Sequence, residues 1–407
     1  MKKVLATILA LVMAIGLCSI SWAAGSALPA AENGVIKLTE NVTLTERWEV
    51  AANTEITLDL NGYSITSAGQ VIMNNGKLTI TDNKGGGKIV STGSQAIGVG
   101  SNSVTNIQKA IVESVEGAVI TGRATGATIN IYDGTFSASD NAVIAGNGSD
   151  RVGTENTINI SGGVFNGKIT TPGYVACGIY APWKDNINVT GGTFNITGGA
   201  GIVARAGNVT VTNAVFNTTG NATGKVGDSR VVVPCSAIVF DSQANYPAMN
   251  NDSVIHVVSG KFNSGMNAVS MIKNDNETDR VDVTGGTFSS DVSDFVDSQP
   301  VAQRNNGEYV VGTSAVVSAA NTDGSITIVE GNDAQLTGVN PGVKVVVRGS
   351  AVSVNGTRVT NDDVNGYTVP SRYYYYPTTD TKATDTKGSP KTFDAGIALY
   401  VGMALTS

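Results

Sequence analysis

A short phrase recurs along the middle of the chain: two branched apolar residues one apart, a small turn, and a phenylalanine. The phenylalanines follow one another at steps of 29, 29, 22, 46 and 26 residues, at Phe136, Phe165, Phe194, Phe216, Phe262 and Phe288. One short strand phrase every twenty-odd residues is typical of a solenoid, because so small a unit cannot bury its apolar face alone. The repeat therefore predicts stacked coils that share one continuous core.

Each phrase reads as a strand, a corner and a second strand. Apolar and polar residues alternate in INIYDGTF (129–136) and INISGGVF (158–165), which indicates strands with one buried face. The Gly-Gly or Asp-Gly pair permits the backbone angles of a tight corner. A fainter apolar phrase trails each phenylalanine, such as CGIYA at 177–181 and SAIVF at 236–240. We expect two or three short strands per coil, and hence an all-β parallel β-helix with like residues about 4.8 Å apart on successive coils.

Two other all-β architectures fit less well. Sandwich strands recur every 8–12 residues without strict self-similarity, and propeller blades run for about 40–45 residues. The 46-residue step contains the second-strand phrase only once, which favours one coil with an insertion near 217–234 that projects from the stack. Ile89 and Val112 lie near the phenylalanine register, so the solenoid is expected to begin before residue 90.

The predicted β-helix covers residues 35–313, and its first part, about 35–65, is expected to cap the stack. Solenoids need caps because an open end exposes backbone edges and apolar side chains. Residues 314–369 contain separate short strands and predict a small C-terminal β module or terminal cap.

The N-terminal segment predicts export. Residues 1–23 combine Lys2 and Lys3, an apolar stretch and the small-x-small end Ser21-Trp22-Ala23, which is the pattern of a secretory signal peptide. Residues 24–34 are expected to be a flexible mature N-terminus. The net charge of −7, without a basic stripe, disfavours nucleic acid as a partner, and no phosphate-binding glycine loop supports a nucleotide.

The C-terminal segment predicts attachment to the cell envelope. Residues 370–388 form a linker that begins with a run of tyrosines and continues rich in Thr, Lys and Asp. Residues 389–407 contain a short motif followed by a truncated apolar stretch. This order resembles the cell-wall sorting region of Gram-positive surface proteins. The motif is Ser389, Pro390, Lys391 and Thr392, with Phe393 where the family has glycine.

A second resemblance, to a fold family, depends on three sets of phrases: the GGTF-type phrases, LDLNGYSI (58–65) and LTITDNKGGGKI (78–89). With them, residues 35–310 resemble the right-handed parallel β-helix family of pectin lyase-like folds, and in particular repeat-bearing surface proteins of Gram-positive gut bacteria. That family includes polysaccharide lyases and glycoside hydrolases. The resemblance therefore implies a scaffold and leaves the activity open.

Alignment of the trailing phrases points to one candidate site. It places Pro182, Arg205, Asp241 and Ile272 in one column, with Trp183 and Lys273 one place on. Aromatic rings could stack on sugars while Arg and Asp bond hydroxyls, and in an enzyme Asp241 and Arg205 would be the catalytic pair. The alternative is a surface ion pair beside an ordinary loop aromatic. The candidate ligand-binding residues are Tyr180, Trp183, Lys184, Asp185, Arg205 and Asp241.

No metal or cofactor is predicted. The single histidine, His256, points away from the core and lacks the partners of a metal site or a triad. Asp275, Glu277 and Asp279 alternate in a loop and could bind calcium weakly, but without the EF-hand pattern a solvated loop is the favoured interpretation. Cys177 and Cys235 are expected to be core thiols two coils apart, with Gly201 between them, which is beyond the reach of a disulfide.

Two functions follow from these features. The first is a non-catalytic exported protein of the cell surface, a β-helical rod whose lateral face binds an extracellular glycan or a host or neighbouring cell. The alternative is a carbohydrate-active enzyme, a lyase or a glycosidase. A groove with two carboxyl groups about 5–9.5 Å apart would favour the enzyme, whereas a flat ladder of Thr and Asn would favour binding.

Overall fold

The structure, a computed structural model, describes residues 27–139, 141–146, 153–169, 171–227, 232–241, 253–273 and 280–371. The predicted signal peptide and the Ser389–Thr392 motif lie outside these ranges. Within them, no helix has both the length and the apolar character needed to span a membrane.

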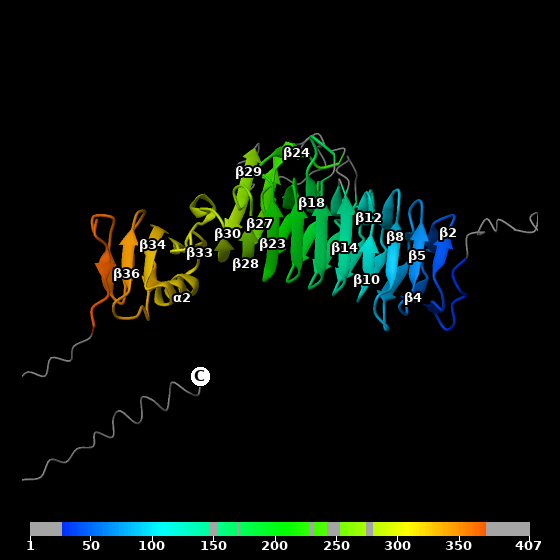
Figure 1. The fold of residues 1–407 in the computed structure, drawn as a ribbon, viewed down its shortest axis with the longest axis horizontal. Helices are drawn as coiled ribbons and strands as arrows, with labels where there is room; N and C mark the ends of the chain where they lie inside the picture. Colours follow the sequence, from blue (N-terminus) through cyan, green and yellow to red (C-terminus); the bar gives the residue numbers. More distant parts are fainter. Residues whose placement is uncertain are drawn as a thin grey trace, which may run out of the picture. The chain divides into compact units, whose positions relative to one another are not determined.

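The chain forms a parallel β-helix in which each coil except the last contributes one strand to each of three sheets (Figure 1). The first sheet contains β1 (Val35–Lys37), β4 (Glu55–Asp59), β7 (Lys77–Thr81), β10 (Val104–Ile107), β13 (Thr128–Ile131), β16 (Thr157–Ile160), β19 (Asn186–Val189), β22 (Asn208–Val211), β27 (Val254–Val257) and β30 (Arg280–Val283). The parallel part of the second contains β2 (Val42–Leu44), β5 (Ser64–Ser67), β8 (Lys88–Ser91), β11 (Ile111–Glu113), β14 (Thr135–Ser139), β17 (Val164–Lys168), β20 (Thr193–Thr197), β23 (Ala214–Thr219), β28 (Gly260–Asn263) and β31 (Gly286–Phe288). The third contains β3 (Trp48–Val50), β6 (Ile72–Asn74), β9 (Gln95–Val99), β12 (Gly117–Gly122), β15 (Ala142–Gly146), β18 (Ala176–Ala181), β21 (Gly199–Ala204), β26 (Ile238–Asp241) and β29 (Val269–Lys273).

The repeated phenylalanines form one column inside the second sheet. All six are fully buried, and successive rings stack with centroids 4.4 to 5.5 Å apart and interplanar angles of 8 to 12°. The column continues through Val112, Ile89 and Ile65 to Val42. The predicted register and the start of the solenoid before residue 90 are therefore confirmed. Residues 35–65 already follow the three-strand pattern of the later coils, and Leu28 packs against their core.

The two glycines of each corner have different tasks. Gly163 and Gly192, the second of each pair, have φ of 100° and 98°, a region that favours glycine. A Cβ on the first glycine, Gly162 or Gly191, would lie 2.4 Å from a carbonyl oxygen of the preceding coil. The Gly-Gly pair thus lets the chain turn sharply while the coils remain in close contact.

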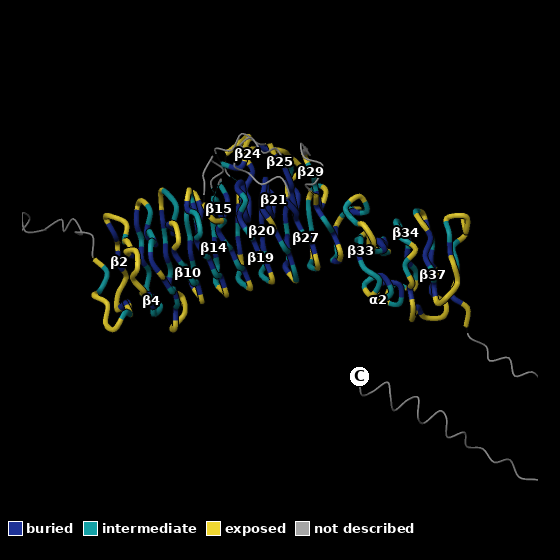
Figure 2. The backbone as a smooth tube through the Cα atoms, turned by 180° about the vertical axis from the view of Figure 1, so that it is seen from behind, coloured by how far each residue is buried: buried dark blue, intermediate teal, exposed yellow. Residues whose placement is uncertain are grey.

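The long step is one coil with an insertion, as predicted, but the insertion does not simply project. Its strands β24 (Thr223–Lys225) and β25 (Val232–Pro234) pair as an antiparallel hairpin that lies over the outer face of the third sheet (Figures 1 and 2). Val226 and Val233 pack there against Val203 and Val239, forming an outer core separate from that of the β-helix. The hairpin folds down because the outward positions of these strands are apolar.

The C-terminal segment ends the second sheet with antiparallel strands and then builds its own core. Its elements are η1 (Ser293–Phe295), β32 (Val301–Gln303), β33 (Tyr309–Val311), α2 (Thr313–Asp323), β34 (Ser325–Glu330), β35 (Gln335–Leu336), β36 (Lys344–Val347), β37 (Val352–Val354), β38 (Thr357–Val359) and β39 (Tyr367–Thr368). Val316, Ile328 and Val345 belong to this second core. The predicted strands are present, but the sequence pattern missed α2, which Gly324 ends with φ of 71°.

Candidate functional site

The central pair of the predicted site, Arg205 and Asp241, does meet on adjacent coils. Arg205 Nε donates to Asp241 Oδ2 at 3.1 Å. The two side chains are 6 % and 0 % exposed, so this is a buried ion pair rather than the surface pair that was the alternative prediction. A buried pair of this kind holds neighbouring coils together, and its carboxylate is out of reach of a polysaccharide.

Trp183 is also fully buried, which contradicts its predicted role as an open platform for sugars. It packs with Ala206, and Lys184 Nζ lies 5.7 Å from its ring centroid. Lys184 also forms an ion pair with Glu155 at 3.0 Å. A hydrogen bond from its own backbone and another from Lys184 lower the pKa of Glu155. The Trp183–Lys184 segment is thus fixed to the preceding coil.

Asp185 belongs to a buried polar cluster in the corner between the third and first sheets. It is 1 % exposed, and its Oδ1 accepts hydrogen bonds from Asn156 Nδ2 at 2.9 Å and from the Asn156 backbone at 3.3 Å. Asn156 in turn reaches Ala124 and Ala127 of the coil before, both at 2.9 Å. The cluster links three coils. Tyr180, the remaining predicted residue, is half-buried against the outer core.

Two register details differ from the prediction. A bulge after Phe240 pairs Asp241 with Lys273 rather than with Ile272. Cys177 pairs with Ala200, not with Gly201. Cys177 and Cys235 are free and buried as expected, and burial raises the pKa of both thiols.

The outer face of the first sheet carries a ladder of side-chain amides. The first amide, Asn106, donates its Nδ2 to Thr79 Oγ1 at 3.4 Å, and each later Nδ2 donates to the amide Oδ1 of the preceding coil at 2.9 Å. This first asparagine ladder consists of Asn106, Asn130, Asn159 and Asn188. On the same face His256 Nδ1 lies 3.1 Å from Asp282 Oδ2 on the next coil, within hydrogen-bond distance. His256 points outward as predicted and has an acidic partner.

The second sheet carries a matching ladder. Its amides bond at 2.8 to 3.3 Å. This second asparagine ladder consists of Asn166, Asn195, Asn217 and Asn263. An amide group has two donors and two acceptor sites, so a ladder bond leaves each amide capacity to bond hydroxyl groups from outside.

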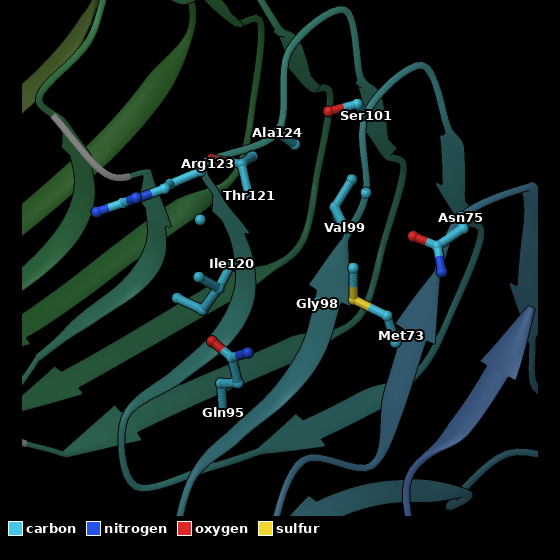
Figure 3. Close-up of a pocket in the computed structure, with 12 residues that line it drawn as sticks. Met73, Asn75, Gln95, Gly98, Val99, Ser101, Ile120, Thr121, Arg123 and Ala124 are labelled. Atoms are coloured by element: carbon cyan, nitrogen blue, oxygen red, sulfur yellow. The ribbon is translucent and has the colours of Figure 1, made fainter. Parts of the chain in front are cut away.

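A groove opens on the outer face of the third sheet at β6, β9 and β12 (Figure 3). In its floor Gly98 lies between Met73 and Ile120 on the neighbouring strands. The depression has a volume of about 320 Å³. We call it the sheet groove. Its residues are Met73, Asn75, Gln95, Gly98, Val99, Gly100, Ser101, Ile120, Thr121, Gly122, Arg123 and Ala124.

The sheet groove has an apolar floor and a polar rim. Gln95 rises beside Ile120, and Arg123 extends from the end of β12 (Figure 3). Among the described residues Arg123 forms no ion pair, and the lining of the groove contains no carboxylate. Sequence reasoning missed this groove because its residues come from the coils without the phenylalanine phrase.

The described residues contain no group of three or more His, Cys, Asp or Glu side chains that could hold a metal ion. The loop with Asp275, Glu277 and Asp279 lies outside them. No family model matches the chain, and no curated protein or solved structure is significantly similar to it.

Proposed function

We propose that the protein is an exported surface protein of the pectin lyase-like kind found in Gram-positive bacteria, and that its β-helix binds extracellular glycans without cleaving them. The supporting observation is the pair of asparagine ladders, which present aligned amides along two faces. Sugar hydroxyls both donate and accept hydrogen bonds, as amides do.

Beside the flat asparagine ladders, we propose the sheet groove as a concave binding site. Its volume of about 320 Å³ lies at the lower end of ligand sites, and its apolar floor with a few polar groups fits the general pattern of such sites. Carbohydrate cleavage by paired carboxylates finds no support there, because the lining residues are not acidic. Asp241 and Arg205, the predicted catalytic pair, are buried.

A glycan array probed with the purified full chain tests this function. We expect retention of a defined set of glycans, weakened by Gln95→Ala or Arg123→Ala. Tyr367→Ala, a change in the C-terminal core segment far along the chain, is the control. Absence of retention under all conditions would contradict glycan binding, and release of reducing or unsaturated ends from polysaccharides would contradict the non-catalytic proposal.

Export is tested separately. Expression of the full chain in a Gram-positive host should give a surface-associated product whose N-terminus begins after Ala23. A product that keeps residues 1–23 inside the cell would refute the export proposal.

A further inference from the structure

A second depression lies where the corner between the second and third sheets meets the insertion hairpin. It has a volume of about 300 Å³. We call it the corner depression. It is lined by Val115, Glu116, Ser139, Asn141, Thr171, Tyr174 and Gly227. From this geometry we propose that the corner depression is a glycan subsite in which one neutral sugar ring stacks on Tyr174. The proposal deepens the proposed function and rests on it.

The apolar part of the subsite is exposed, unlike Trp183. Tyr174 and Val115 are 37 % and 41 % exposed, although both are large hydrophobic residues. A phenol ring at the edge of a depression offers a flat surface to the apolar face of a pyranose, while its hydroxyl stays in water. This is the combination that the predicted Tyr180–Trp183 site lacks.

The insertion hairpin fixes the position of Tyr174. The backbone N–H of Lys225 in β24 donates to Gly173 at 3.1 Å, and that of Val175 donates to Lys225 at 2.8 Å. Gly224 lies so close that a Cβ there would be 2.8 Å from the Tyr174 carbonyl carbon. The backbone on both sides of Tyr174 is therefore hydrogen-bonded to β24, so little backbone entropy is lost when a ligand binds there.

The polar rim suits a neutral, hydroxyl-rich ligand. Glu116 offers a carboxylate that already accepts a bond from Ser94 at 3.1 Å, and a carboxylate repels acidic sugars. Asn141 uses its Oδ1 to accept from Ala142 at 2.8 Å, and no described residue bonds its Nδ2. The rim thus supplies an acceptor and a donor for two sugar hydroxyls.

The subsite continues onto the second sheet. Ser139 also lines a neighbouring depression of about 490 Å³ that includes Asn166, Asn195 and Lys168. A glycan chain could therefore extend from Tyr174 to the end of the second asparagine ladder. A peptide strand fits this surface less well, because β12, β14 and β15, which border the depression, are each paired on both sides.

An array of neutral, sulfated and sialylated oligosaccharides, probed with the full chain and its variants, tests the subsite. We expect wild type to retain neutral oligosaccharides, Tyr174→Ala to bind them roughly tenfold more weakly, and Tyr174→Phe to keep the affinity within about twofold. Glu116→Gln, an exposed change, should weaken the same glycans. Tyr132→Ala is the matched control, because Tyr132 is 52 % exposed and does not line the depression.

The outcomes separate the two proposals. If wild type binds glycans and neither Tyr174→Ala nor Glu116→Gln changes the affinity while Arg123→Ala does, the subsite is refuted and the proposed function stands. If the retained glycans are only sulfated or sialylated, the proposed ligand class is wrong. If wild type retains no glycan at all, both proposals fall.

Discussion

At the scale of residues, each phenylalanine of the buried column makes a large contribution to the stability of the core. Phe194 is fully buried, with Phe165 and Phe216 stacked on its two sides at 4.4 and 4.6 Å. Phe194→Ala should lower the free energy of unfolding by about 3–5 kcal/mol, because it removes a large buried side chain and leaves a cavity. Urea unfolding followed by circular dichroism measures this. A loss no larger than that of Tyr132→Ala, on the exposed corner, would contradict the stacked column.

The buried ion pair gives a second test at this scale. Arg205→Met should destabilise the protein by about 3–5 kcal/mol, because it leaves the buried Asp241 carboxylate without its guanidinium partner. Adding Asp241→Leu should restore much of that loss. The control is Arg358→Met: Arg358 pairs with Asp333 at 2.8 Å, but both side chains are about two-thirds exposed, so the cost should stay below about 1 kcal/mol. Equal losses in the two single variants would argue against burial of the Arg205 pair.

At the scale of elements, the hairpin β24–β25 covers the outer core that contains both cysteines. Val233→Asp places a charge in this core and should detach the hairpin, because an unpaired buried charge is costly. Burial raises the pKa of Cys177 and Cys235 and shields them, so the native thiols should be inert at pH 8 and should react with a thiol reagent in the variant.

The neighbouring residue supplies the control for the hairpin. Val232 is 50 % exposed and Val233 is fully buried, so Val232→Asp should leave the thiols inert. Far-UV circular dichroism should stay unchanged in both variants, because the β-helix core lies beneath. Inert thiols in Val233→Asp would show that the hairpin is not what protects them.

The elements also show what the sequence could predict. Strands that repeat, such as β13, β16 and β19, were predictable because Ile129, Ile158 and Ile187 occupy one column. Elements without a repeat were not. The hairpin depends on contacts across the coil, and α2 has few strong helix formers, so its helical state follows from Val316 and Ala320 packing into the C-terminal core.

At the scale of the whole molecule, register explains both the success and the failure at the candidate site. Counting from the repeat placed Arg205 beside Asp241 on adjacent coils, as the structure has them. The repeat spacing does not predict whether Arg205 and Asp241 face water, because their burial depends on segments outside the repeat. The sheet groove and Tyr174 were missed for the same reason: each arises where the repeated pattern stops.

Register also predicts that a whole coil can be removed. Thr57 lies beside Thr79 and Leu58 beside Ile80, so deletion of residues 58–79 joins Thr57 to Ile80 with every later side chain facing as before. Because each coil contacts mainly its neighbours, the shortened chain should keep its β-sheet circular dichroism and unfold cooperatively. Deletion of 58–80 removes one residue more, joins Thr57 to Thr81, and puts the strand out of step with the pleat. We expect that variant to aggregate or to be digested rapidly by protease, and equal behaviour of the two deletions would refute a core built from aligned coils.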